Sequence, residues 1–100
     1  MYIPKITKGK LELYNERGIY QRTITSKDVV FADINMTQTL IVVADIKGRV
    51  QLYNEHGIYQ RTIVSSNATS ARWMGTDIAV TETNGRIKIY NERGIYQRTI

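Results

Sequence analysis

The chain lacks cysteine and has a single histidine among its 100 residues. The absence of cysteine excludes disulfide bonds and thiolate metal sites, and it fits a reducing compartment. His56 has no second histidine and no cysteine with which to build a metal site or a catalytic pair. We therefore expect neither a bound metal nor another cofactor.

Long apolar runs are also absent. No segment approaches the roughly 20 consecutive apolar residues of a membrane-spanning helix. The opening residues, Met1 to Lys5, lack the apolar core of a signal peptide. These absences predict a soluble, cytoplasmic protein that makes no contact with a membrane.

Motifs for catalysis are scarce as well. The acidic residues outside the repeated hairpins described below are Asp28, Asp33, Asp45, Asp77 and Glu82. None of them forms a closely spaced pair with an activating partner, and no phosphate-cradling loop, nucleophile elbow or zinc ligand set occurs. The sequence therefore favours a protein that is not an enzyme and assigns no catalytic residue.

What the chain does contain is an eleven-residue phrase, Tyr14 to Ile24, which returns with one change at 53–63 and unchanged at 90–100. Alternating apolar residues precede each copy, and this period of two predicts a β-strand. In the Asn-Glu-Arg-Gly segment, asparagine suits the first turn position and Gly18 tolerates the positive φ of a short hairpin with a bulge. Each copy therefore predicts a β-hairpin.

The spacing of the hairpins defines a longer repeat. Their turn glycines stand at positions 18, 57 and 94, which gives periods of 39 and 37 residues. Further strand-like segments lie between the hairpins at 28–34 and 39–45, and again at 69–73 and 77–82. One repeat thus consists of four short antiparallel strands in about 40 residues. Aligned at this period, the first repeat lacks its innermost strand.

This pattern resembles the blade of a β-propeller, especially of the NHL and WD-repeat types. The residue pattern resembles that of NHL repeats in three segments, Ile41–Asp45, Gly48–Tyr53 and Arg61–Ile63. The segment Thr83–Tyr90 is similar to the corresponding part of a WD blade. The Trp-Asp and Gly-His signatures of WD repeats are absent. The resemblance therefore concerns the architecture.

The resemblance implies an all-β fold of antiparallel four-stranded blades, with about three blades in the chain. Residues 1–100 would form one propeller-like domain, with a partial blade at 1–24 and blades at 25–63 and 64–100. A propeller closes with roughly four to eight blades, and fewer leave apolar faces in water. We therefore expect a homodimer that closes a ring of about six blades, with a homotrimer as the alternative. A compact monomeric β-fold is the remaining possibility.

Basic residues gather where blade geometry predicts one rim of the propeller. The candidate partner-binding or anion-binding residues on this rim are Lys8, Lys10, Lys27, Lys47, Arg49 and Arg86. The chain carries a net charge of +5, and cations that recur around an axis can follow a phosphate backbone or an acidic peptide. The competing interpretation is that they are solvated charges or partners of the nearby carboxylates Asp28, Asp45 and Glu82.

Trp73 and its neighbour Arg72 complete the candidate set. Trp73 stands where the preceding repeat has Ile34, in a strand expected near the propeller axis. A tryptophan there can serve as a binding platform, although one that replaces isoleucine in a repeat is more often part of a core or an interface.

Two further features recur in every hairpin. Arg22, Arg61 and Arg98 lie in the outermost strand, where charge discourages unwanted strand pairing. A pair of tyrosines, Tyr14 and Tyr20 in the first copy, predicts cross-strand packing, with stacking of bases or sugars as the alternative.

Together these features favour a non-catalytic binding platform that recognises RNA, DNA or an acidic protein surface through its basic rim. NHL-type propellers use such faces for RNA and protein, so the resemblance implies the same here. One alternative is a small-molecule or glycan binder with pockets between blades, although lectins of that kind usually repeat tryptophan and this chain has one. A protein-interaction scaffold is the third possibility, because near-identical repeats suit multivalent binding.

Overall fold

The computed structural model describes residues 1–100, which form eleven β-strands and no helix. The strands are β1 (Tyr2–Thr7), β2 (Lys10–Asn15), β3 (Tyr20–Thr25), β4 (Val29–Ile34), β5 (Leu40–Asp45), β6 (Val50–Asn54), β7 (Tyr59–Val64), β8 (Ala68–Met74), β9 (Asp77–Glu82), β10 (Ile87–Asn91) and β11 (Tyr96–Thr99). All neighbours pair antiparallel, and three separate sheets result. Sheet 1 is β1-β2-β3, sheet 2 is β4-β5-β6-β7, and sheet 3 is β8-β9-β10-β11.

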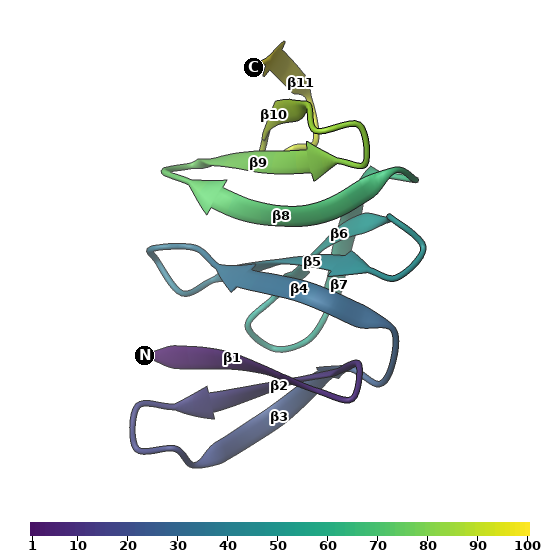
Figure 1. Ribbon diagram of the computed structural model, residues 1–100. Helices are drawn as coiled ribbons and strands as arrows, with labels where there is room; N and C mark the ends of the chain where they lie inside the picture. Colours follow the sequence, from purple (N-terminus) through teal and green to yellow (C-terminus); the bar gives the residue numbers. More distant parts are fainter.

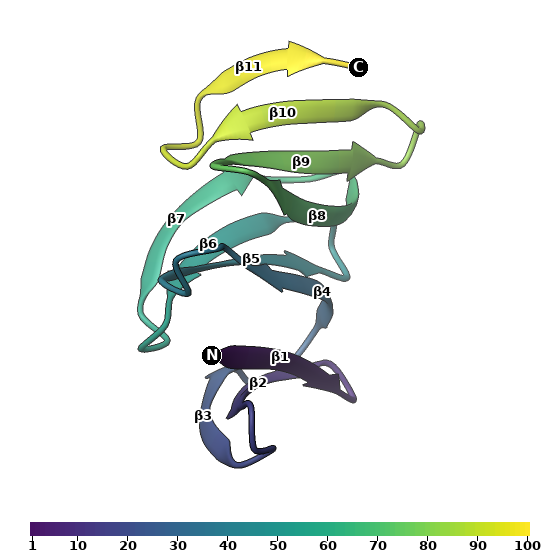
Figure 2. The same cartoon turned by 90° about the vertical axis from the view of Figure 1, so that its left-hand side faces the viewer.

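The three sheets are stacked in chain order, with sheets 1 and 3 at opposite ends of the stack (Figures 1 and 2). Sheet 1 has three strands because it lacks the inner one, as the repeat period predicts. Its β1 lies against β4 in the way that β5 lies against β8. The inner strands β4 and β8 also contact each other, and this contact has no counterpart in sheet 1.

The repeated phrase folds into the same hairpin each time. In the turn between β2 and β3, Asn15 Oδ1 accepts hydrogen bonds from the amides of Arg17 at 2.9 Å and Ile19 at 3.0 Å. Gly18 has a φ of 78°, and the register of β2 and β3 shifts beside the turn. The equivalent turns of sheets 2 and 3 contain the same hydrogen bonds. The predicted hairpin with a bulge is therefore confirmed.

The tyrosines of each hairpin pack on one another across the two strands. The pairs are Tyr14 with Tyr20, Tyr53 with Tyr59, and Tyr90 with Tyr96. In every pair the ring centroids are 5.9 Å apart and the rings meet edge to face, the geometry that aromatic pairs prefer. The cross-strand packing predicted from the sequence is confirmed.

Two apolar cores hold the stack together. The core between sheets 1 and 2 consists of Leu11, Leu13, Ile24, Val29, Ile41 and Val43. The core between sheets 2 and 3 consists of Val42, Ala44, Val50, Leu52, Ile63, Ala68, Ala71, Ile78 and Val80. Strand β5 supplies alternate residues to both cores, because successive side chains of a strand point to opposite faces. Its unbroken apolar sequence is therefore that of a strand covered on both sides.

Candidate functional site

One side of the stack, to which all three sheets contribute strand ends, collects the turns β1–β2, β5–β6 and β9–β10 together with the connections β3–β4 and β7–β8, on the right of Figure 1. We call this side the basic rim. Backbone hydrogen bonds tie the sheets together here, from Val29 N to Gly9 O at 2.9 Å and from Ala68 N to Gly48 O at 3.0 Å. A Cβ on Gly48 would lie 2.7 Å from Asn67 N, so glycine is needed for this close approach.

Six of the candidate residues are exposed on the basic rim: Lys8, Lys10, Lys27, Lys47, Arg49 and Arg86. Two of them have acidic partners, since Lys10 Nζ lies 3.5 Å from Glu12 and Arg49 Nε lies 2.9 Å from Asp45. The side chains of the other four form no ion pair and no hydrogen bond within the chain. These four, which we call the free rim cations, are Lys8, Lys27, Lys47 and Arg86.

Asp45 organises the turn between β5 and β6 and is 8% exposed. Its Oδ1 accepts hydrogen bonds from the amides of Lys47 and Arg49, both at 3.0 Å, and its Oδ2 accepts one from Arg49 Nε. In sheet 3 the corresponding Glu82 binds Lys88 at 3.2 Å instead. The guanidinium of Arg86 consequently has no carboxylate partner, although Arg86 and Arg49 occupy equivalent turns.

Arg72 and Trp73 lie near the far end of β8, next to the β8–β9 turn, and the structure does not bring them to the basic rim. Trp73 packs against the core between sheets 2 and 3. Its amide donates to Asp33 Oδ2 at 2.9 Å, which links the inner strands β8 and β4. Arg72 is exposed. These contacts support the core interpretation of Trp73.

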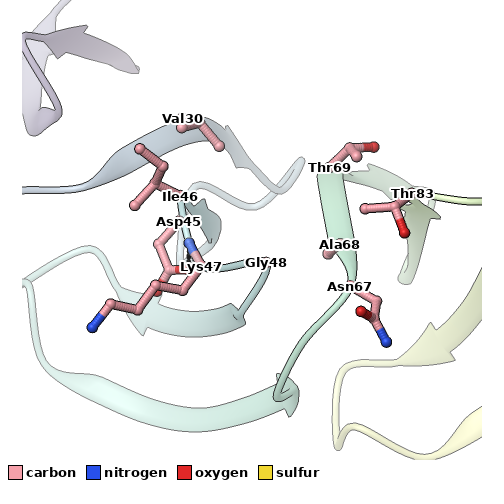
Figure 3. Close-up of a pocket in the computed structure, with 9 residues that line it drawn as sticks. All are labelled: Val30, Asp45, Ile46, Lys47, Gly48, Asn67, Ala68, Thr69 and Thr83. Atoms are coloured by element: carbon pink, nitrogen blue, oxygen red, sulfur yellow. Dashed lines mark hydrogen bonds between the residues drawn. The ribbon is translucent and has the colours of Figure 1, made fainter.

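Two pockets open on the basic rim where neighbouring sheets meet. The larger, of about 370 Å³, lies between sheets 2 and 3, and its lining includes Asp45, Lys47, Asn67 and Thr69. Figure 3 shows the sheet 2 residues on one side of this pocket and the sheet 3 residues on the other. The smaller, of about 150 Å³, lies between sheets 1 and 2 beside Lys27. No local sequence signal marks either pocket, because each forms only where turns of different repeats meet.

Three tyrosine hydroxyls, one in each hairpin, have shifted ionisation. Burial raises the pKa of Tyr14, Tyr53 and Tyr90 above the ordinary value. A tyrosine with a raised pKa remains protonated near neutral pH, so it donates a hydrogen bond and does not act as a base. The Tyr53 hydroxyl accordingly donates to Gln51 Oε1 at 3.5 Å.

Other features bear on the kind of site. The structure gathers no group of three or more histidine, aspartate or glutamate side chains that could hold a metal ion. It has no helix of the length and apolarity that crossing a membrane requires. The recurrent arginines Arg22 and Arg61 contact the hairpin turns of the next sheet, where the sequence predicted only a charged edge.

Comparison with known proteins shows one matching family and several solved structures with a similar fold. The family model described as the Helicobacter pylori IceA2 protein matches residues 39–100. The search of curated proteins gives no match. Among solved structures, the chain is similar to Saccharomyces cerevisiae Sqt1, with a TM-score of 0.76 and 15% identity over 92% of this chain and 28% of that one.

The chain is also similar to the WD40 repeats of RRP9, with a TM-score of 0.82 and 12% identity over 99% of this chain and 34% of that one. It thus spans about a third of the length of these structures. The predicted resemblance to propeller blades is confirmed, because the chain matches WD40 repeat structures and its three antiparallel sheets have three or four strands each. At such low identity the likeness concerns the fold alone.

Proposed function

The chain belongs to the IceA2 family, and we propose that it is a non-catalytic propeller that binds an acidic protein surface through its basic rim. The observation that carries this proposal is the set of free rim cations, which are exposed and have no acidic partner within the chain. A propeller fold hosts many functions, so the argument rests on these side chains and not on the fold.

The rim carries more positive than negative charge. Asp45 and Glu82 are already paired with Arg49 and Lys88, which leaves Asp28 as the exposed aspartate of the basic rim. Clustered cations of one sign raise the local potential and attract an acidic partner over a distance of about 10 Å at moderate salt. An acidic surface that approaches the rim therefore meets charges available for pairing.

An acidic protein is favoured over RNA or DNA by the position of the aromatic residues. Single-stranded nucleic acids are usually held by cations combined with aromatic rings on which the bases stack. Trp73 packs against a core away from the rim, and the tyrosine pairs pack on one another. The rim thus offers charge with few free stacking surfaces.

We also propose that the propeller is completed by a homodimer, with a homotrimer as the alternative. Support for this comes from the number of sheets, since the chain has three and propellers close with roughly four to eight. The outward faces of sheets 1 and 3 are the surfaces available for closure.

Binding of fluorescent polyglutamate and of an RNA homopolymer, measured by anisotropy at increasing salt, tests the rim. We expect polyglutamate to bind and to be released steeply by salt. The variant Lys8→Gln/Lys47→Gln should weaken binding about tenfold, because each lost pairing is worth up to about 1 kcal/mol. The matched control Arg17→Gln/Arg93→Gln removes the same charge from hairpin turns on the side of the stack opposite the basic rim.

Three results would contradict the proposal. Binding that is insensitive to salt would remove its electrostatic basis. Equal weakening in the rim variant and in the control would assign binding to net charge and not to the rim. Binding of RNA without binding of polyglutamate would replace the acidic protein with a nucleic acid.

A small molecule or glycan is the second candidate ligand, and the pocket between sheets 2 and 3 favours it. Its volume of about 370 Å³ lies within the range of ligand sites. A thermal-shift screen with a glycan and metabolite library tests this function. A true ligand should raise the unfolding midpoint of the wild type more than that of Thr69→Leu, whose larger side chain would narrow the pocket.

A further inference from the structure

The outer strand of one sheet clasps the hairpin turn of the next sheet. In the first instance, Arg22 of β3 donates through Nη1 to the backbone carbonyl of Glu55, in the β6–β7 turn. Two residues further on, Ile24 approaches Gly57, where an added Cβ would lie 3.5 Å from the isoleucine Cδ1. We call these two contacts together the clasp.

The clasp recurs between sheets 2 and 3 with the same residue types. Arg61 Nη1 donates to the carbonyl of Glu92 at 2.5 Å, in the β10–β11 turn. Ile63 Cδ1 would lie 3.4 Å from a Cβ on Gly94. The contact is therefore a property of the repeat, because it forms at both junctions in the chain.

Sheet 3 carries the donor half of a third clasp. Arg98 corresponds to Arg22 and Arg61, yet it is exposed and forms no hydrogen bond or ion pair. Ile100 corresponds to Ile24 and Ile63, and it is 71% exposed where each of those is 8% exposed. Nothing within the chain receives this half.

Sheet 1 carries the acceptor half. Its turn, Asn15 to Gly18, has the same sequence as the turn at 91–94 that Arg61 and Ile63 bind. The two turn glycines have similar φ angles, 78° at Gly18 and 84° at Gly94. Glu16 O accepts no backbone hydrogen bond, and a Cβ on Gly18 would meet nothing within 4 Å.

We infer that a second copy of this chain docks its sheet 1 against sheet 3, with Arg98 donating to the partner copy's Glu16 carbonyl and Ile100 packing on its Gly18. The inference rests on the proposed assembly and specifies the joint. A second copy is the occupant that fits, because it presents the very turn sequence that the clasp already binds at 91–94. Since the two faces differ, the contact is head to tail, and two such contacts close a ring.

The joint between copies is weaker than the junctions within a chain. At both internal junctions a rim carbonyl, such as Gly48 O, also accepts a hydrogen bond from the inner strand of the next sheet. Gly85 O has no such partner in a second copy, because sheet 1 lacks an inner strand. The assembly should therefore dissociate on dilution before the sheets themselves unfold.

Sedimentation velocity over a range of concentrations tests the clasp with the variant Arg98→Ala. The matched control is Arg93→Ala, which removes the same charge at an exposed turn position that His56 occupies in sheet 2. Wild type and Arg93→Ala should form dimers of the 11.5 kDa chain. The dissociation constant of Arg98→Ala should rise about tenfold or more, because each joint loses a charge-assisted hydrogen bond.

A second variant and a stability measurement separate assembly from folding. Ile100→Asp places a carboxylate in the same joint and should also dissociate the dimer. The unfolding midpoints of dilute monomers should match that of wild type, because Arg98 has no partner within the chain. A wild type that remains at 11.5 kDa up to high concentration would overturn the inference, as would dimers of equal stability in Arg98→Ala and Arg93→Ala.

Polyglutamate binding on the same samples distinguishes this inference from the function proposed for the rim. Loss of assembly with retained, salt-sensitive binding in Arg98→Ala supports the clasp and leaves the rim intact. A normal dimer in wild type that does not bind polyglutamate supports the clasp and removes the rim function alone.

Discussion

Replacing Gly48 by alanine should separate the free energy of contact between sheets from that of the turn itself. Gly48 and Gly85 hold the same position in the β5–β6 and β9–β10 turns, with φ angles of 82° and 88°. A Cβ at Gly48 would lie 2.7 Å from Asn67 N, whereas one at Gly85 would meet nothing within 4 Å. The two substitutions therefore share the backbone strain and differ in the clash.

The magnitudes follow from these two effects. An L-residue in the left-handed region costs about 1–2 kcal/mol, which applies to both variants. At Gly48 the turn and the start of β8 must also move apart, and overpacking of this kind costs about 1–3 kcal/mol more. We thus expect a destabilisation of about 2–5 kcal/mol for Gly48→Ala and about 1–2 kcal/mol for Gly85→Ala. Gly9→Ala should fall between them, since its Cβ would lie 3.0 Å from Asp28 N.

Urea unfolding followed by the fluorescence of Trp73 measures these differences, because Trp73 packs against the core between sheets 2 and 3 and reports on the affected junction. Free energies are extrapolated to water under a two-state model, with circular dichroism as a second probe of the transition. Equal free energies of unfolding for Gly48→Ala and Gly85→Ala would refute the idea that close approach of the sheets requires glycine at position 48.

Three further substitutions test other contacts. Asp45→Ala should lower the free energy of unfolding by about 2–3 kcal/mol, because two turn hydrogen bonds and the pairing with Arg49 are lost together; Asp45→Asn, which keeps an acceptor oxygen, should lower it less in the same urea titration. Arg61→Ala should cost about 1 kcal/mol through loss of its clasp, and a cost no larger than that of Arg98→Ala in the monomer would show that the clasp contributes nothing. Burial raises the Tyr53 pKa, so folding favours the protonated hydroxyl over the ionised one. The stability that Tyr53 contributes is therefore complete below the unfolded-state pKa and is lost as pH rises through the folded-state value. Stability should therefore fall at alkaline pH less steeply in Tyr53→Phe than in wild type, and identical slopes would contradict this.

The hairpins and the missing inner strand could be predicted from the sequence because their determinants are local or periodic. Asn15 and Gly18 specify a turn through hydrogen bonds and a φ angle that lie within five residues. The repeat period then places every later strand and shows which strand the first repeat lacks. The same period places the six candidate cations on one side of the stack, the basic rim.

The contacts between repeats could not be predicted in this way. Arg22 binds a backbone carbonyl more than 30 residues away, and a carbonyl has no side-chain signature that a sequence pattern can reveal. Period alone also makes Arg49 and Arg86 equivalent. The structure separates them, because Asp45 folds back onto Arg49 while Glu82 reaches Lys88 in the neighbouring strand. Which rim cations are free therefore depends on side-chain geometry.

The acceptor turns of the clasp and the basic rim lie at opposite ends of the strands, and this separation bears on how assembly and binding combine. The acceptor turns of the clasp follow β2, β6 and β10, whereas the free rim cations lie in turns and connections at the other end. A copy docked through the clasp would therefore leave the rim uncovered. Rotation of one copy onto the next about a ring axis keeps the strand ends on the same side. The free rim cations of all copies would then share one face, so an extended acidic partner would meet several copies at once and gain avidity that a dissociated monomer lacks.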